Sequence, residues 1–490
     1  MRIIAFQSWV ASSVRSAGLA LGIVSVGSCL ASAPSATERG LAKVIPGAQP
    51  FVRLSEAPEG KTWVYQLALP FQLSADKAAL FCNVRESGAK GLDYEVGVDV
   101  IIFDDLKKSA GLAPIPVTRV HEGKNPNSKP PGKRAFMAKY PARGGFVPLG
   151  AKRDDGSPFP HAGTGFGLNL AVGWNWDDPD STAGYPGYRY KEGPPWGTYT
   201  FSGAEAYSYF ELHQFAYDGT KFEVKSSRRV AGTDLLPGWV FGNGGITNAI
   251  PDGDDLLVGM VGGRKDAKVS GSGLMRWRFL EGEWKPVAYT PVPGCEKSYE
   301  PSLVRDRDGS LLFLARRDGN DILIWRSQDG GTTWTKIIHV GGVVSRAPIV
   351  LNRAVDGTPY VAANLYQVFL GPLDKIFPRL KPGGPYSLGG GTRNAVYLWP
   401  LNNERNGLGI PLKVRDCLEE WGPPSSGSAW MVDHPIAAPL RLADGRWHNV
   451  LVTRIRDFAE SIYAAPPTER TGTYLDEIVS RGEPVPVWNF

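Results

Sequence analysis

The chain has 490 residues, with 54 lysines and arginines against 49 acidic residues, so its formal net charge is only +5. No block of basic residues stands out, which argues against a nucleic-acid-binding surface. Glycine (59) and proline (40) are abundant, and aromatic residues make up 11% of the chain. Short aromatic and β-branched runs between Gly, Pro and Asp predict an all-β sandwich, barrel or propeller.

Residues 1–33 have the pattern of a signal peptide. A basic start precedes an apolar stretch, and Ala31-Ser32-Ala33 is a small-residue cleavage pattern. The roughly ten apolar residues are too few to span a bilayer. The residues up to Cys29 also resemble a lipobox, in which Cys29 would be acylated. We therefore expect a secreted or periplasmic protein without a membrane span, with an outer-membrane lipoprotein as the alternative.

A local pattern of apolar run, Asp-Gly and apolar run recurs along residues 45–490. An Asp-Gly pair between apolar strands predicts a hairpin, because the turn needs positive φ. Repetition of one such unit predicts sheets that stack radially, which is a β-propeller within a single domain. We expect six blades, or seven if N-terminal strands complete an additional one. Their expected ranges are 51–115, 143–230, 240–293, 297–341, 344–416 and 430–485.

The segment 324–334 indicates the type of fold more specifically than the overall composition does. Its Ser327-Gln328-Asp329-Gly330-Gly331-Thr332-Thr333-Trp334 resembles the Asp box, or BNR repeat, of the sialidase-like propeller superfamily. The Asp carboxylate can accept hydrogen bonds from the turn, and glycine permits the tight conformation. The resemblance implies a structural hairpin between the third and fourth strands of a blade, away from the active site.

The hairpin before it carries a second resemblance. Sialidases have a glutamate, an Asp-Gly turn and an arginine in this order, matched by Glu300, Asp308-Gly309 and Arg316. The resemblance implies a catalytic carboxylate at Glu300 and a carboxylate-binding arginine at Arg316. A two-residue turn would instead pair Glu300 with Arg317, and a three-residue turn would pair it with Arg316. A purely structural ion pair is the alternative.

Two arginines are candidates for the family's next substrate-binding position, namely Arg393 and Arg346. Where sialidases have a tyrosine nucleophile, the strand around residues 431–439 carries Asp433-His434. Some propeller polysaccharide lyases have a histidine before an inner strand, and histidine can take a proton near neutral pH. His434 is thus a candidate base, with a core histidine as the alternative. His161, in a glycine-rich segment, is a weaker substrate-binding candidate.

Three functions are compatible with these motifs. A sialidase-like exo-glycoside hydrolase acting on an acidic glycan ranks first, on the Glu300 hairpin. A lyase cleaving a uronate-containing polysaccharide by β-elimination ranks second. The third is a glycan-binding propeller without catalysis. We expect an acidic oligo- or polysaccharide as the partner, a monomer, and no cofactor or metal. The aromatic residues that could stack on sugars in the third case are Trp174, Trp176, Tyr185, Tyr188, Tyr190 and Trp196.

Overall fold

The structure is a computed structural model of the chain. It describes residues 40–52, 54–55, 63–86, 95–108, 112–119, 135–176, 189–190, 199–201, 204–242, 247–266, 270–317, 321–341, 344, 347–364, 393, 395–422, 429–458 and 469–490. The signal-peptide residues 1–33, including Cys29, lie outside these ranges, as do Tyr185, Tyr188 and Trp196. The side chains of Trp174, Trp176 and Tyr190 also lie outside the description. Within the described ranges, no helix is both long enough and apolar enough to cross a membrane.

The strands form six sheets. The first three follow one another along the chain. Blade 1 contains β2 (Leu54–Ser55), β3 (Trp63–Gln72), β4 (Ala78–Glu86), β5 (Glu95–Phe103) and β6 (Pro114–Arg119). Blade 2 contains β7 (Ala135–Val147), β8 (Thr164–Trp176), β9 (Arg189–Tyr190), β10 (Tyr199–Phe201), β11 (Ala204–Tyr217) and β12 (Phe222–Val230), and β14 (Thr247–Asn248) pairs with β7. Blade 3 contains β13 (Trp239–Phe241), β15 (Ile250–Asp252), β16 (Asp255–Arg264), β17 (Gly271–Leu280) and β18 (Glu283–Glu296).

The other three sheets are four-stranded. Blade 4 contains β19 (Tyr299–Arg305), β20 (Leu311–Arg316), β21 (Ile322–Ser327) and β22 (Thr335–Val340). Blade 5 contains β23 (Val350–Arg353), β24 (Pro359–Ala363), β25 (Ala395–Pro400) and β26 (Leu412–Asp416), followed by the short helix α2 (Cys417–Trp421). Blade 6 contains β27 (Ala429–Arg441), β28 (Trp447–Phe458), β29 (Gly472–Ser480) and, as its outermost strand, β1 (Leu41–Ile45).

The sheets close into a ring through their inner edges. The inner strands β27, β3, β7, β19 and β23 contact one another in this order, with β14 and β16 between β7 and β19. Each of the six boundaries between neighbouring blades is filled by its own cluster of buried apolar side chains. Between blades 2 and 3, for example, the rings of Phe166 and Trp277 stack at 4.0 Å. The prediction of a six-bladed propeller is therefore confirmed.

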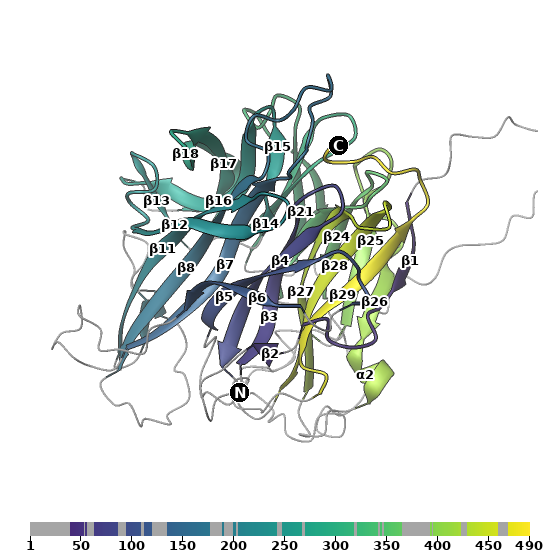
Figure 1. Cartoon of the computed structure of the whole chain (residues 1–490), viewed down its shortest axis with the longest axis horizontal. Coiled ribbons are helices and arrows are strands. Elements are labelled where there is room, and N and C mark those ends of the chain that lie inside the picture. The colour runs from purple at the N-terminus through teal and green to yellow at the C-terminus, as the bar shows by residue number, and fades with distance from the viewer. Residues whose placement is uncertain are drawn as a thin grey trace, which may run out of the picture. The chain divides into compact units, whose positions relative to one another are not determined.

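The N-terminal strand β1 closes the ring by completing the last blade. It pairs antiparallel with β29, with Val44 opposite Ile478, and lies beside the yellow C-terminal strands in Figure 1. Residues 41–45 thus belong to the propeller. Because β1 joins an existing sheet, the described strands form no seventh blade.

The 327–334 turn joins β21 to β22, the two outer strands of blade 4. Asp329 accepts hydrogen bonds from the backbone N–H of Thr333 (2.8 Å) and from its hydroxyl (2.6 Å). These hydrogen bonds lower the pKa of Asp329 to about 2. Trp334 packs edge-on against Phe313 at 5.5 Å. These contacts lie within the turn itself and with Phe313 of the same blade, so the segment stabilises the blade.

His448, at the start of β28, lies between two carboxylates. Its Nδ1 is 2.8 Å from Glu477 Oε1 and its Nε2 is 3.2 Å from Asp444 Oδ1. The hydrogen bond to Glu477 is the largest of the effects that raise the pKa of His448 above its usual 6.5. Because the pKa is higher in the folded state, the protonated imidazole stabilises the fold fully at pH values below the unfolded-state pKa. This contribution is lost as the pH rises through the folded-state pKa.

We expect the free energy of unfolding of the wild type to fall more steeply between about pH 6 and pH 8 than that of His448→Gln. Urea denaturation at several pH values measures both slopes. Subtracting the variant's curve removes contributions from other groups, since the glutamine does not titrate. Parallel curves would show that the carboxylates do not hold the charged imidazole in the folded protein.

Candidate active site

Glu300 and His434 share an unusual backbone conformation on two inner strands. Both have positive φ, +49° and +55°, and both precede a proline. Each lies in a β-bulge, because the register of β19 with β20 shifts between Tyr299 and Ser302 and that of β27 with β28 shifts between Asp433 and Ile436. Non-glycine residues in this conformation carry strain, which concentrates at functional sites. Glu300 is the second residue of β19 and interacts electrostatically with His434, so both residues lie toward the end of the ring where the inner strands begin, which we call the N-end.

The bulge corrects the register expected for the Glu300 hairpin. The turn spans residues 306–310, between Arg305 and Leu311, and Tyr299 is the residue opposite Arg316. Glu300 therefore has no residue opposite it, contrary to both turn lengths considered above. Its side chain nevertheless reaches Arg316, whose Nη1 donates a 2.6 Å hydrogen bond to Glu300 Oε2. Arg317 is exposed beyond the end of β20 and makes no recorded contact with Glu300 among the described residues.

Arg316 is held on two sides. Besides the bond to Glu300, its guanidinium lies 4.9 Å from the centre of the Tyr299 ring. Burial acts to raise the pKa of Glu300, but the charges of Arg316, His434 and Arg393 outweigh it and hold the pKa below the usual value. Glu300 is therefore ionised at neutral pH. Only Nη1 of Arg316 is used by Glu300, so further N–H donors of its planar guanidinium remain for a substrate anion.

Asp433 is the centre of the site and is fully buried. Arg454 binds it through two hydrogen bonds, Nε to Oδ1 at 2.8 Å and Nη2 to Oδ2 at 2.9 Å. Arg393 donates from Nη1 to Oδ2 at 2.6 Å. His434 Nδ1 lies 2.8 Å from Oδ1. Burial would raise the pKa of Asp433, but Arg454, His434 and Arg393 hold it well below the usual value.

The ionised Asp433 determines which nitrogen of His434 carries the proton. A carboxylate only accepts hydrogen bonds, so Nδ1 must be the donor and Nε2 keeps its lone pair. In the part of the chain that the structure describes, Nε2 has no hydrogen-bond partner. Burial and the charge of Arg454 lower the pKa of His434, although Asp433 and Glu300 counteract them. The imidazole is therefore neutral near pH 7 and has the form required of a general base.

The described charges of this cluster do not cancel. Three guanidinium groups face two carboxylates and one neutral imidazole, which leaves a net charge of about +1. The positive charges come from Arg316, Arg393 and Arg454. In the described ranges no group of three or more His, Cys, Asp or Glu side chains is arranged to hold a metal ion.

The structure gives a different outcome for each of the remaining candidates, Arg346, His161 and Arg393. Arg346 lies outside the described residues. His161 belongs to the turn between β7 and β8, where its ring stacks on Phe279 at 4.1 Å. That turn follows the end of inner strand β7, so His161 does not join the N-end cluster. Arg393, predicted from sequence, does join it through Asp433.

Sequence reasoning missed Arg454, which is buried beside Asp433. Counting back from the Asp444-Gly445 turn in the register of Arg441 with Trp447 would place residue 455, not 454, opposite residue 433. The bulge between Asp433 and Ile436 shifts the register by one residue and brings Arg454 opposite Asp433. Because the sequence does not reveal this bulge, it does not identify Arg454 as the partner of Asp433.

No family model and no curated protein matches the sequence. Three solved structures illustrate its similarity to known folds. A protein of unknown function from Dyadobacter fermentans has a TM-score of 0.48 and 13% identity, covering 89% of this chain and 99% of its own. Trypanosoma rangeli sialidase has a TM-score of 0.47 and 12% identity, covering 91% and 60% respectively. A variant of the NanB sialidase from Streptococcus pneumoniae has a TM-score of 0.48 and 11% identity, covering 88% and 70%.

Proposed function

We propose that this chain is an exported enzyme that cleaves an acidic polysaccharide at a uronate residue by β-elimination. The observation that carries the proposal is the Asp433–His434 pair, in which Nδ1 is bound to the carboxylate at 2.8 Å and Nε2 keeps its lone pair. The conclusion differs from the sequence-based ranking, which placed hydrolysis first. The protonation states of the site residues are the reason for the change.

The reaction requires a base and a means of neutralising the uronate carboxylate. His434 Nε2 removes the proton from the carbon next to the carboxylate, and the electrons of that C–H bond form a carbon–carbon double bond. The bond to the glycosidic oxygen on the adjacent carbon breaks at the same time or directly afterwards. The imidazolium then returns its proton to the departing oxygen. Arg316 binds the carboxylate through its remaining donors and stabilises the charge that develops on it.

Hydrolysis is the second candidate, because the Glu300–Arg316 pair matches the order found in sialidases. Hydrolysis of a glycosidic bond normally uses a protonated acid that donates a proton to the departing oxygen. Within the described cluster, both Glu300 and Asp433 are held in the ionised form. Elimination needs only the one neutral base that the cluster supplies, so it agrees better with the geometry.

Product analysis tests the proposal directly. The purified protein is incubated with a panel of uronate-containing and sialylated glycans, and the products are followed by ultraviolet absorbance and by reducing-end assay. We expect new reducing ends together with absorbance from an unsaturated uronate. Reducing ends without absorbance would support the hydrolase, and binding without cleavage across the panel would support the third, non-catalytic hypothesis.

Replacing Arg316 by lysine should strongly reduce turnover with little change in stability. Lysine keeps the charge opposite Glu300 but loses the planar fork that grips a carboxylate. We expect kcat/KM to fall about 100-fold and Tm to change by less than about 4 °C. Arg317→Lys is the matched control, because it makes the same change on the adjacent exposed residue. Unchanged kinetics in Arg316→Lys would remove this arginine from the substrate site.

A further inference from the structure

The end of the ring opposite the candidate active site contains a cavity of about 810 Å³. The inner strands end here, and the C-terminal segment 485–489 forms part of the wall. Its volume falls within the range of small-molecule binding sites, about 300–1,000 Å³. None of the residues assigned to the candidate active site lines it. We call this the C-end cavity.

Arg353, the last residue of β23, is the distinctive cation of the C-end cavity. Its Nη1 donates to the carbonyl oxygen of Val485 at 3.1 Å, whereas its Nε is buried without a hydrogen-bond partner. Among the described residues no carboxylate lies within ion-pair distance of Arg353. Burial lowers the pKa of this guanidinium, although Asp306 and Asp356 counteract it. A buried donor of this kind is costly to leave unpaired, and a bound anion would satisfy it.

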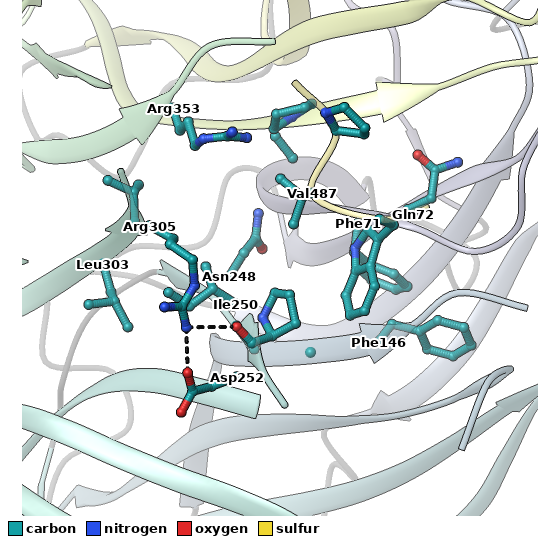
Figure 2. A pocket seen from close by; sticks show the side chains of 18 of the residues that line it. Phe71, Gln72, Phe146, Asn248, Ile250, Asp252, Leu303, Arg305, Arg353 and Val487 are labelled. Carbon is teal, nitrogen blue, oxygen red and sulfur yellow. Dashed lines mark hydrogen bonds and ion pairs between the residues drawn. The ribbon is translucent and has the colours of Figure 1, made fainter. Parts of the chain in front are cut away.

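Arg305 and Asp306 of the wall are already paired, whereas Arg307 is not fully paired. Arg305 donates a 2.6 Å hydrogen bond to Asp252, as the dashed lines in Figure 2 show. Asp306 accepts hydrogen bonds from Arg405 at 2.6 and 2.9 Å. Nη1 of Arg307 is buried without a partner in the described part of the chain, like Nε of Arg353. The unsatisfied donors of the cavity therefore belong to arginine and favour a negatively charged group.

The neutral polar side chains of the wall join the inner strands to one another. Gln72 donates to the carbonyl oxygen of Arg441 at 2.7 Å and accepts from its N–H at 2.7 Å. Asn352 donates to the carbonyl oxygen of Pro435 at 3.0 Å. Because these amides are occupied by structural contacts, recognition of a ligand falls to the unsatisfied donors of Arg353 and Arg307.

The opposite side of the cavity is aromatic. Phe71 and Phe146 stack with ring centres 5.7 Å apart, and Figure 2 places both on the side away from Arg305 and Arg353. Trp488 also lines the cavity and is fixed by an edge-on contact with Phe159 at 5.5 Å. An apolar, flat ligand body would pack against these rings.

We propose that the C-end cavity binds an organic carboxylate with a flat apolar body, its carboxylate on Arg353 and its body against Phe71 and Trp488. This site is separate from the proposed lyase site and does not depend on it. The combination of unsatisfied arginine donors with an aromatic wall selects an anion that is apolar elsewhere.

Isothermal titration calorimetry on the full chain tests the proposal with three probes: indole-3-acetate, its neutral amide indole-3-acetamide, and acetate. We expect indole-3-acetate to bind at least about tenfold more tightly than either of the others, since one lacks the charge and the other the apolar body. Arg353→Gln should reduce indole-3-acetate binding to the level of the amide and leave amide binding unchanged. Equal binding of acid and amide, or no detectable binding of the acid, would overturn the proposal.

Two further variants locate the bound probe. Arg228→Gln removes the same charge from the outer strand β12, where the side chain is 51% exposed, and should leave binding unchanged. His434→Ala, at the opposite end of the ring, should also bind indole-3-acetate normally. Loss of binding in His434→Ala with retention in Arg353→Gln would place the probe in the N-end cluster and contradict a C-end site.

Discussion

Replacing His434 by alanine is expected to abolish turnover while leaving the propeller folded. The substitution removes the only neutral base of the described cluster, so kcat should fall about 1,000-fold or more. Asp433 keeps its three hydrogen bonds from Arg454 and Arg393, and the fold should lose no more than about 2 kcal/mol. His434→Gln provides a second test, because the amide can still donate to Asp433 but cannot act as a base.

The pH profile gives an independent check of the same role. The pKa of His434 lies below its usual value, so the base is active when deprotonated and kcat/KM should rise with pH to a plateau below about pH 7. Glu300→Gln is the matched comparison. If it is more damaging than His434→Ala, and the product has no ultraviolet absorbance, Glu300 carries the reaction and the enzyme is a hydrolase.

The blades were predictable because their turns need a particular conformation. The recurring Asp-Gly pairs all have glycines with positive φ, between 60° and 84°; these glycines are Gly156, Gly253, Gly309, Gly357 and Gly445. Blade 1 was the exception, because its inner turn runs through Ala75-Asp76 without glycine and is fixed by a hydrogen bond from Ser74 to Asp76. The pairing of β1 with β29 joins residues more than 400 positions apart. No local pattern encodes it, so the sequence left six and seven blades as alternatives.

The structure brings together candidate residues that the sequence singled out, but the sequence did not predict their geometry. Glu300, Arg316, Arg393, Asp433 and His434 were all singled out, and they lie in one cluster. The two bulges were not anticipated, because a bulge shifts register through a single residue whose φ depends on tertiary contacts. The bulges bring Glu300 and His434 close enough for their charges to interact. The pKa directions of the site depend in turn on this arrangement, and they changed the ranking of the two reactions.

Replacing Asp433 by asparagine should reduce both activity and stability, unlike His434→Ala. The variant leaves Arg454 and Arg393 without their carboxylate, and removing one partner of a buried ion pair costs about 3–5 kcal/mol. An asparagine amide can also donate to Nδ1 of His434, which would move the imidazole proton to Nε2 and remove the base. We expect kcat to fall by about 100-fold to 10,000-fold, with a lower denaturation midpoint.

Asp476→Asn separates the two effects. Asp476 is as buried as Asp433 and accepts a 2.9 Å hydrogen bond from Arg415, but it lies on β29, outside the N-end cluster. Both variants should lose comparable stability, because each strands a buried arginine. Only Asp433→Asn should lose turnover when both are assayed well below their melting temperatures. Equal activity in the two variants would mean that Asp433 has only a structural role in blade 6. The position of the proton on the His434 imidazole would then not depend on Asp433 in the way the mechanism requires.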